Sequence, residues 1–129
     1  FSLKKDMKYF KDSKCIITLR KPIGTFHSIY QNPSMAYAGL DVKKFIKWYK
    51  FIYKKIQKLN FDENCLIINF EDFILKNKEI KDKIYNFLNM DEQKINFNVE
   101  NSLRNVTQIE NEIDKKSLDL IKSELKEFL

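Results

Sequence analysis

The fold is best predicted from the stretch CIITLRKPIGTFHSIY, residues 15–30. It opens with the apolar, β-branched run 15–19, which is typical of a short buried strand. Arg20 follows, and the turn-forming residues Pro22 and Gly24 lead into a segment with helical character. The pattern predicts a buried strand, a tight turn and the first turns of a helix.

This bend predicts an anion site. Ligands of open α/β sheets bind just beyond the carboxyl ends of the strands. A helix N-terminus at that place offers free backbone N–H groups and a partial positive charge. Arg20 adds a planar, permanently charged fork, and Ser28 adds a hydroxyl eight residues later. We therefore expect a phosphate site formed by Arg20 and Ser28.

A second apolar run, LIINF at residues 66–70, predicts a second strand. Because it shows no alternation, it fits a parallel strand that is buried on both faces. Between the two runs, residues 42–59 carry apolar side chains at helical spacing, with Asp41 as the N-cap. Strand, helices, strand and helix in this order form a βαβ pattern.

The rest of the chain is predicted to be mainly helical. We expect a short amphipathic helix over residues 1–10, a helix over 24–31 and another over 78–90. Residues 91–113 are polar and irregular, and Asp114 caps a final helix.

The composition is that of one folded domain, residues 1–129. Hydrophobic residues make up 43% of the chain and there are only two glycines and two prolines, which argues against disorder and long linkers. No apolar run approaches the roughly 20 residues needed to cross a bilayer. Cys15 and Cys65 have no metal-ligand spacing, so we expect small buried side chains, no metal site and a reducing, cytoplasmic location.

The net charge of +6 suits anionic ligands such as nucleic acid, phosphorylated cofactors, acidic glycans or a lipid surface. However, the 24 basic residues are interleaved with 18 acidic ones. We therefore expect most lysines to form an ordinary solvated surface.

The arrangement Arg-x-Pro at Arg20, with Ser28 eight residues after the arginine, resembles the 3′-phosphate-binding segment of the sulfotransferases that use 3′-phosphoadenosine 5′-phosphosulfate (PAPS). That family also has a strand ending in Tyr-Glu-Asp-Leu, a helix, and a phrase ending in Phe-Leu. The sequence NFEDFILKNKEIKDKIYNFLNM, residues 69–90, is similar to this layout. The resemblance covers essentially all 129 residues, as the C-terminal part of the family's domain. It implies a three-layer α/β/α fold of the P-loop type, represented here by two short parallel strands and about five helices.

The resemblance also implies an activity, transfer of a sulfonate from PAPS to a hydroxyl or amine acceptor such as a carbohydrate. Arg20 and Ser28 would bind the 3′-phosphate of PAPS or of its product, adenosine 3′,5′-bisphosphate. Phe70 stands where the family has a tyrosine near the adenine, and Arg104, in NSLRNVTQ, would supply charge from a loop that lacks the family's glycines. We expect His27, the single histidine, to be structural or on the surface, and no residue is assigned as the catalytic base.

Glu71 and Asp72 follow the second strand, and we expect structural roles for both as helix-start caps and partners of nearby basic or N–H groups. The family's 5′-phosphosulfate loop, Pro-Lys-Ser-Gly-Thr-Thr, has no counterpart among these residues. Since the chain begins with Phe1 and two strands make a poor sheet alone, we expect an N-terminal segment or another chain to add a strand between or beside them. The chain by itself would then be inactive.

Other function classes stay open. A basic nucleic-acid-binding module would show exposed aromatic side chains on a sheet face or a one-sided stripe of Lys and Arg, although the buried strands argue against this partner. Another P-loop nucleotide-dependent transferase, such as a kinase, would need a Walker-type Gly-Lys-Ser/Thr upstream. A non-catalytic remnant would keep only the fold and a partner surface.

Overall fold

The computed structural model of the protein describes residues 13–32, 41–58, 63–91 and 108–129. The described elements are, in chain order, β1 (Cys15–Leu19), α2 (Pro22–Gln31), α3 (Val42–Gln57), β2 (Cys65–Asn69), α4 (Phe70–Leu75), α5 (Asn77–Leu88), the 3₁₀ helix η1 (Ile109–Glu112), α7 (Lys115–Glu124) and the 3₁₀ helix η2 (Lys126–Phe128). The predicted mixed α/β class, with two strands and a helical majority, is confirmed.

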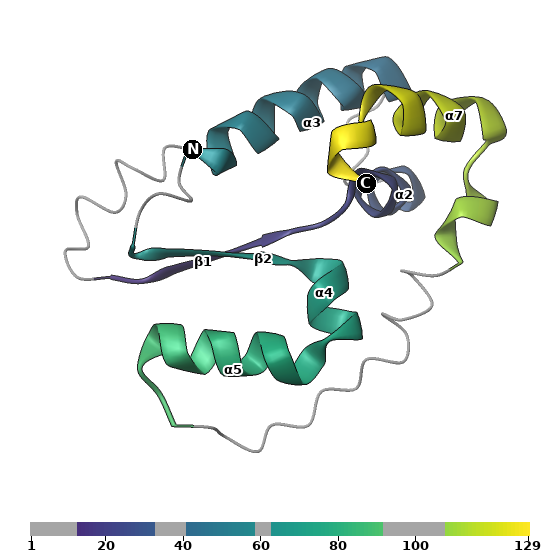
Figure 1. The fold of residues 1–129 in the computed structure, drawn as a ribbon. Helices are drawn as coiled ribbons and strands as arrows, with labels where there is room; N and C mark the ends of the chain where they lie inside the picture. Colours follow the sequence, from purple (N-terminus) through teal and green to yellow (C-terminus); the bar gives the residue numbers. More distant parts are fainter. Residues whose placement is uncertain (1–12, 33–40, 59–62, 92–107) are drawn as a thin grey trace.

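The two strands pair directly with each other and run parallel, in a register that places Cys15 opposite Cys65 and Leu19 opposite Asn69. The expectation of a missing strand between them is therefore wrong, while a strand beside them stays a prediction. Both cysteines are free thiols. The carboxyl ends of both strands lie at one edge of the sheet, where α2 and α4 begin (Figure 1).

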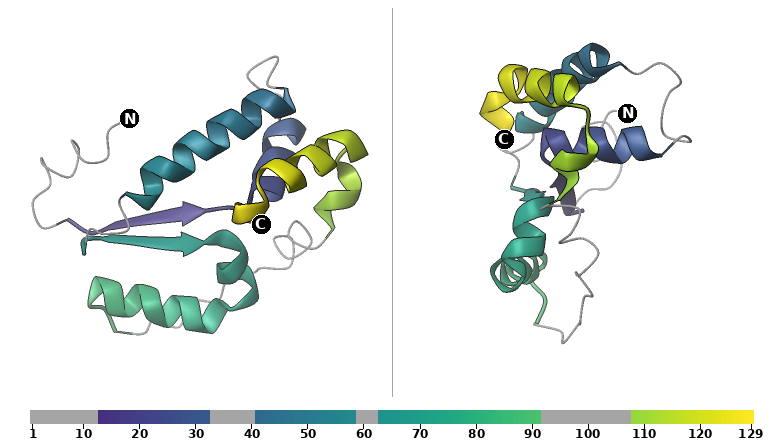
Figure 2. Two further views of the ribbon diagram at one scale, coloured as in Figure 1. Left: turned by 45° about the horizontal axis from the view of Figure 1, so that its top comes forward. Right: turned by 90° about the vertical axis from the view of Figure 1, so that its right-hand side faces the viewer.

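Helices lie on opposite sides of the strands. Figure 1 shows α3 on one side and α5 on the other, and Figure 2 shows α7 beside α3. The main hydrophobic cluster is formed where α2, α3, η1 and α7 meet, and its buried members are Ile23, Phe26, Phe45, Ile46, Tyr49, Ile109, Ile113, Ile121 and Leu125. The α5 side is more weakly buried, since its apolar residues are only half-buried, namely Ile80, Ile84, Phe87 and Leu88.

Several boundaries differ from the prediction. Helix α2 begins at Pro22 rather than Gly24, because the fixed φ of proline suits the first position of a helix. Phe70 is the first residue of the short helix α4 and not the last of β2, so Glu71 and Asp72 lie in the first turn of that helix. The backbone of Lys76, at φ −119° and ψ 42°, then separates α4 from α5.

The predicted N-caps are confirmed. The Asp41 carboxylate accepts a hydrogen bond from the backbone N–H of Lys44 at 2.8 Å, and the Asp114 carboxylate accepts one from Ser117 at 2.9 Å. Each satisfies a backbone donor that the helix itself leaves open. No described helix is long and apolar enough to cross a membrane. The helix predicted over 1–10 lies outside the described residues.

Candidate functional site

The two strand-to-helix bends meet at the carboxyl edge of the sheet. Leu19 and Asn69 are register partners, so the next residues, Arg20 and Phe70, leave the sheet side by side. The Arg20 Cζ atom lies 5.1 Å from the centroid of the Phe70 ring. This distance is within the range of a cation–π contact. Two of the predicted site residues are thus brought into contact.

Gly24 lets the Arg20 side chain lie against the first turn of α2. A Cβ atom at Gly24 would stand 2.7 Å from Arg20 Nε and 3.4 Å from both Cδ and Cγ. Real side chains do not approach so closely, so any other residue here would displace the arginine. The sequence pattern predicts only a turn at Gly24. The spacing of four from Arg20, which is one helical turn, is the signal that could have identified this contact.

Ser28 is exposed on α2, one helical turn beyond Gly24. Residues four apart lie on the same face of a helix. The hydroxyl therefore continues the face that Arg20 covers at Gly24. The joint binding of a phosphate by Arg20 and Ser28 stays a prediction.

The backbone of the bend is tied to α3. The Arg20 carbonyl accepts a hydrogen bond from the Tyr49 hydroxyl at 2.8 Å, and the Thr25 hydroxyl lies 3.1 Å from the same oxygen. Burial, followed by the charges of Tyr53 and Glu71, raises the pKa of Tyr49 well above its ordinary value. The phenol therefore stays protonated and available as a donor.

Glu71 ties the second bend to the first. Its Oε1 accepts a hydrogen bond from the backbone N–H of Lys21 at 3.0 Å, and the residue is only 7% exposed. This contact confirms the predicted structural role toward an N–H group. It joins residues 50 apart in the sequence, so it holds the starts of α2 and α4 together.

Two buried polar atoms at this edge have no hydrogen-bond partner among the described residues. They are Arg20 Nε, a donor, and Glu71 Oε2, an acceptor. A buried polar group without a partner lowers stability, and a native structure holds few of them. The edge therefore has an unpaired donor on Arg20, the residue predicted to bind an anion.

The remaining predicted residues fall elsewhere. Arg104 lies outside the described residues. His27 is buried, and its Nε2 lies 2.8 Å from Glu112 Oε2. This pair joins α2 to η1. Of the two predicted positions for His27, structural or on the surface, the structure shows the structural one.

A pocket of about 240 Å³ opens beside the bend, between the end of β1 and α3. Its polar lining comes from Thr18, Arg20 and Thr25, and its aromatic lining includes Trp48 and Tyr53. The other residues that line it are mostly apolar, and its volume is below the roughly 300 Å³ at which typical small-molecule sites begin. The helical spacing of apolar residues over 42–59 gives no sign of this opening.

The described part of the chain holds no group of three or more His, Cys, Asp or Glu residues that could bind a metal ion. Comparison with known proteins adds no assignment, because no family model, no curated protein and no solved structure matches this chain.

Proposed function

We propose that this chain is the C-terminal part of a PAPS-dependent sulfotransferase and that it binds the 3′-phosphate of the nucleotide. One observation carries the proposal. The Arg20 guanidinium lies on the Phe70 ring, so the two segments that resemble the family's signatures meet at the carboxyl edge of a parallel sheet. That edge is where open α/β sheets bind their ligands.

In this proposal Arg20 supplies the charge for the phosphate, and Ser28 donates from the next turn of α2. The cation–π contact, the absent side chain of Gly24 and the carbonyl held by Tyr49 limit the positions open to the arginine. A guanidinium that is already ordered loses less conformational entropy when a ligand binds. Phe70 would contact adenine through the part of its ring that Arg20 leaves open.

The reaction proposed for the whole enzyme is an in-line transfer. The bond between the sulfonate and the 5′-phosphate of PAPS breaks, a bond to the acceptor oxygen or nitrogen forms, and adenosine 3′,5′-bisphosphate leaves. The acceptor gives up its proton to a general base. No stretch of this sequence resembles a 5′-phosphosulfate loop, so this chain would supply cofactor affinity and register.

Calorimetric titration with adenosine 3′,5′-bisphosphate and with 5′-AMP tests the proposal. The bisphosphate should bind more tightly, because only it carries a 3′-phosphate. Arg20→Ala should weaken its binding by about 2 kcal/mol or more, roughly 30-fold.

The matched control for this titration is Lys21→Ala. It removes a neighbouring charge but keeps the backbone N–H that Glu71 accepts. We expect a loss of no more than about threefold from a nearby exposed charge. Equal affinities for the two nucleotides, or an unchanged affinity in Arg20→Ala, would refute the proposal.

A further inference from the structure

The positive charge of this protein is concentrated on α3. Seven of the 24 basic residues lie between positions 42 and 58, a segment without any acidic residue. The other 17 basic residues are slightly outnumbered by the 18 acidic ones. The prediction that basic and acidic residues are interleaved is therefore wrong for this helix, which accounts for the whole net charge of +6.

These lysines point away from the core. Phe45, Ile46 and Tyr49 are buried on one side of α3. Since successive residues of a helix turn by about 100°, the lysines fall on the remaining sides. We call this set the lysine face, and its members are Lys43, Lys44, Lys47, Lys50, Lys54, Lys55 and Lys58. Over the roughly 24 Å of a 16-residue helix it presents one sign of charge.

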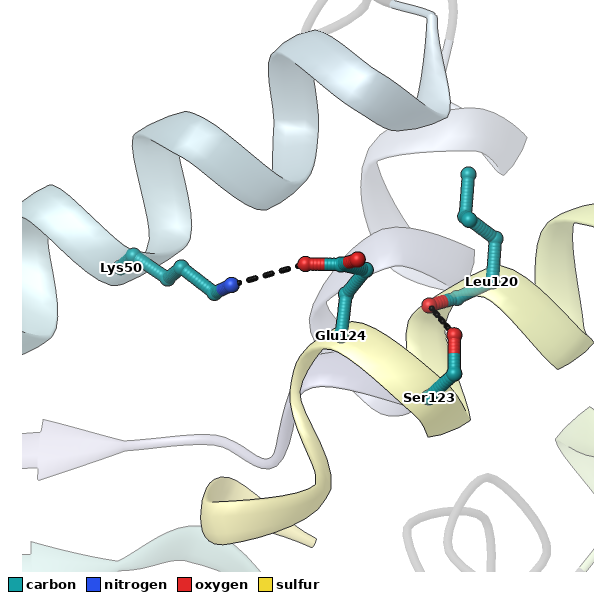
Figure 3. Close-up of polar contacts among 4 residues, drawn as sticks. All are labelled: Lys50, Leu120, Ser123 and Glu124. Atoms are coloured by element: carbon teal, nitrogen blue, oxygen red, sulfur yellow. Dashed lines mark hydrogen bonds and ion pairs between the residues drawn. The ribbon is translucent and has the colours of Figure 1, made fainter.

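One lysine at the edge of this face is partly neutralised. Figure 3 shows Lys50 of α3 pointing at Glu124 of α7, with Lys50 Nζ 3.0 Å from a carboxylate oxygen. Both side chains are substantially exposed, so this ion pair contributes little to stability. This ion pair marks the boundary of the lysine face toward α7.

Two aromatic side chains are exposed on this part of α3, Phe51 among the lysines and Trp48 beside them. Phe51 is 55% exposed and Trp48 is 42% exposed. The helical positions place Phe51 opposite the buried side, at the middle of the lysine face. Lys55 Nζ lies 4.4 Å from the centroid of the Phe51 ring. Lysines near a membrane are attracted to anionic lipids, and an exposed phenylalanine can bury apolar area at the headgroup boundary.

We propose that the lysine face of α3 docks this protein on an anionic lipid bilayer. Lysine is a compact point charge that needs no directed hydrogen bond, which suits a surface of mobile headgroups. Phe51 would enter the interface, while Lys55 extends along its ring to keep the ammonium in the headgroup layer. The binding would be peripheral, because the apolar side of α3 is already buried in the core.

Nucleic acid is the competing polyanion, and the one-sided stripe that would support it is present on α3. The details of the face favour lipid. Base stacking needs an open ring face, and the Lys55 ammonium lies over one face of Phe51. Reading of base edges relies on arginine, asparagine and glutamine, whereas Gln57 is the single such side chain from Val42 to Gln57. The face is also the outside of a single helix and not a groove along which a strand could run.

Trp48 makes the test direct, because it is the chain's one tryptophan and lies next to this face. Its fluorescence is followed while the full chain is titrated with vesicles of phosphatidylcholine alone, with vesicles containing about 30% phosphatidylserine, and with a single-stranded oligonucleotide. We expect a blue shift of the tryptophan fluorescence and saturable binding only with the anionic vesicles. Raising the salt concentration should weaken this binding.

Two matched variants locate the surface. Each exposed lysine near an anionic membrane contributes about fivefold to binding, so changing Lys43, Lys47, Lys54 and Lys58 together to Gln should reduce vesicle binding at least about 50-fold. The control changes Lys78, Lys83, Lys115 and Lys126 to Gln, which removes the same charge from other exposed positions. We expect a loss of less than about fivefold in the control.

Phe51→Ser tests the insertion of the Phe51 ring into the bilayer interface separately from the charge of the lysines. It should reduce the affinity for anionic vesicles about tenfold and leave the weakening by salt unchanged. Circular dichroism of each variant checks that α3 is still formed. Three results would overturn the proposal: no binding to anionic vesicles, equal losses in the two quadruple variants, or tighter binding to the oligonucleotide than to the vesicles.

Discussion

Arg20 can lie against α2 because Gly24 has no side chain. The short approach to Arg20 Nε at 2.7 Å is to a flexible side chain, so a Cβ at position 24 would move the arginine and leave the fold intact. The role of this glycine is to give Arg20 its place, and no unusual backbone conformation is involved. Stability and ligand binding should therefore respond to a substitution here in opposite ways.

Gly24→Ala is expected to keep or raise the stability of the protein and to weaken binding of the proposed ligand. Alanine in a helix gains up to about 1 kcal/mol over glycine, less the cost of moving the arginine. Affinity for adenosine 3′,5′-bisphosphate should fall about tenfold, because Arg20 leaves its position. Urea unfolding measures the change in the free energy of unfolding, and calorimetry measures the change in affinity for the nucleotide.

The double variant Gly24→Ala with Arg20→Ala is the control for this prediction. It should bind no more weakly than Arg20→Ala alone, since the two changes act on one group. Full additivity of the two losses would show that Gly24 acts through something other than Arg20.

Glu71→Ala is expected to destabilise the protein by about 2 kcal/mol, because the Lys21 N–H loses a charged acceptor in a buried place. Glu71→Gln keeps an oxygen for this N–H and should cost less. Asp72→Ala removes a carboxylate from the same turn, where the residue is less buried and its Oδ2 lies 3.4 Å from Asn69 Nδ2. Chemical denaturation ranks the three variants. A loss for Asp72→Ala as large as that for Glu71→Ala would contradict this role of Glu71.

The sequence indicated the candidate site residues but not the contacts that hold them in place. Arg20 and Phe70 could be selected because each directly follows an apolar run. The acceptor of the Lys21 N–H and the donor to the Arg20 carbonyl come from residues 50 and 29 positions away. Such pairings depend on the tertiary fold and leave no mark in the local pattern.

At the scale of elements, β1, α3 and the two capped helix starts could be predicted, since apolar periodicity and cap residues are local signals. The boundary between β2 and α4 could not, because an aromatic residue suits the end of a strand and the start of a helix equally well. The lysine face was also missed, since a net charge averaged over the chain hides one helix without acidic residues.

The N-cap of α7 predicts a pH dependence. Hydrogen bonds from Ser117 to the Asp114 carboxylate lower the pKa of Asp114 below its ordinary value of 3.8. The folded state thus favours the ionised carboxylate, whose stabilising effect is full above that value and is lost as the pH falls through the lowered pKa. Asp114→Asn should unfold at a lower temperature than wild type at neutral pH, and the difference should shrink on acidification below about pH 4.

Asp119→Asn is the control for this pH dependence. It removes a charge from an exposed position of the same helix, away from its N-cap. We expect that the difference in unfolding temperature between Asp119→Asn and wild type does not shrink in this way on acidification. If the difference in unfolding temperature between Asp114→Asn and wild type stays constant from neutral to acidic pH, the assignment of Asp114 as the N-cap is contradicted.

At the scale of the whole molecule, burial is uneven. The main cluster joins α2, α3, η1 and α7, whereas α5 has no fully buried residue. Ile16 of β1 is 38% exposed, which fits the expectation of a further strand beside β1. The composition predicted a folded core but could not place it, because apolar residues occur in every predicted helix.

This unevenness should appear in native-state hydrogen exchange. Segments with few buried contacts open at lower free energy. We expect the amides of α5 to exchange through openings that cost less than those of α3. Mass spectrometry of the exchanging chain measures both helices together. Equal opening free energies in α3 and α5 would contradict the uneven core.

The proposed function requires that the bend from β1 to α2 binds the 3′-phosphate of a nucleotide through Arg20 and Ser28. NMR titration of the isotope-labelled chain with adenosine 3′,5′-bisphosphate tests it most directly. Binding of the 3′-phosphate should shift most strongly the Arg20 side-chain Nε–H and the backbone amides from Ile23 to Ser28, with much smaller shifts for 5′-AMP. Shifts that leave Arg20 and Ser28 unchanged, or that are the same for both nucleotides, would contradict it.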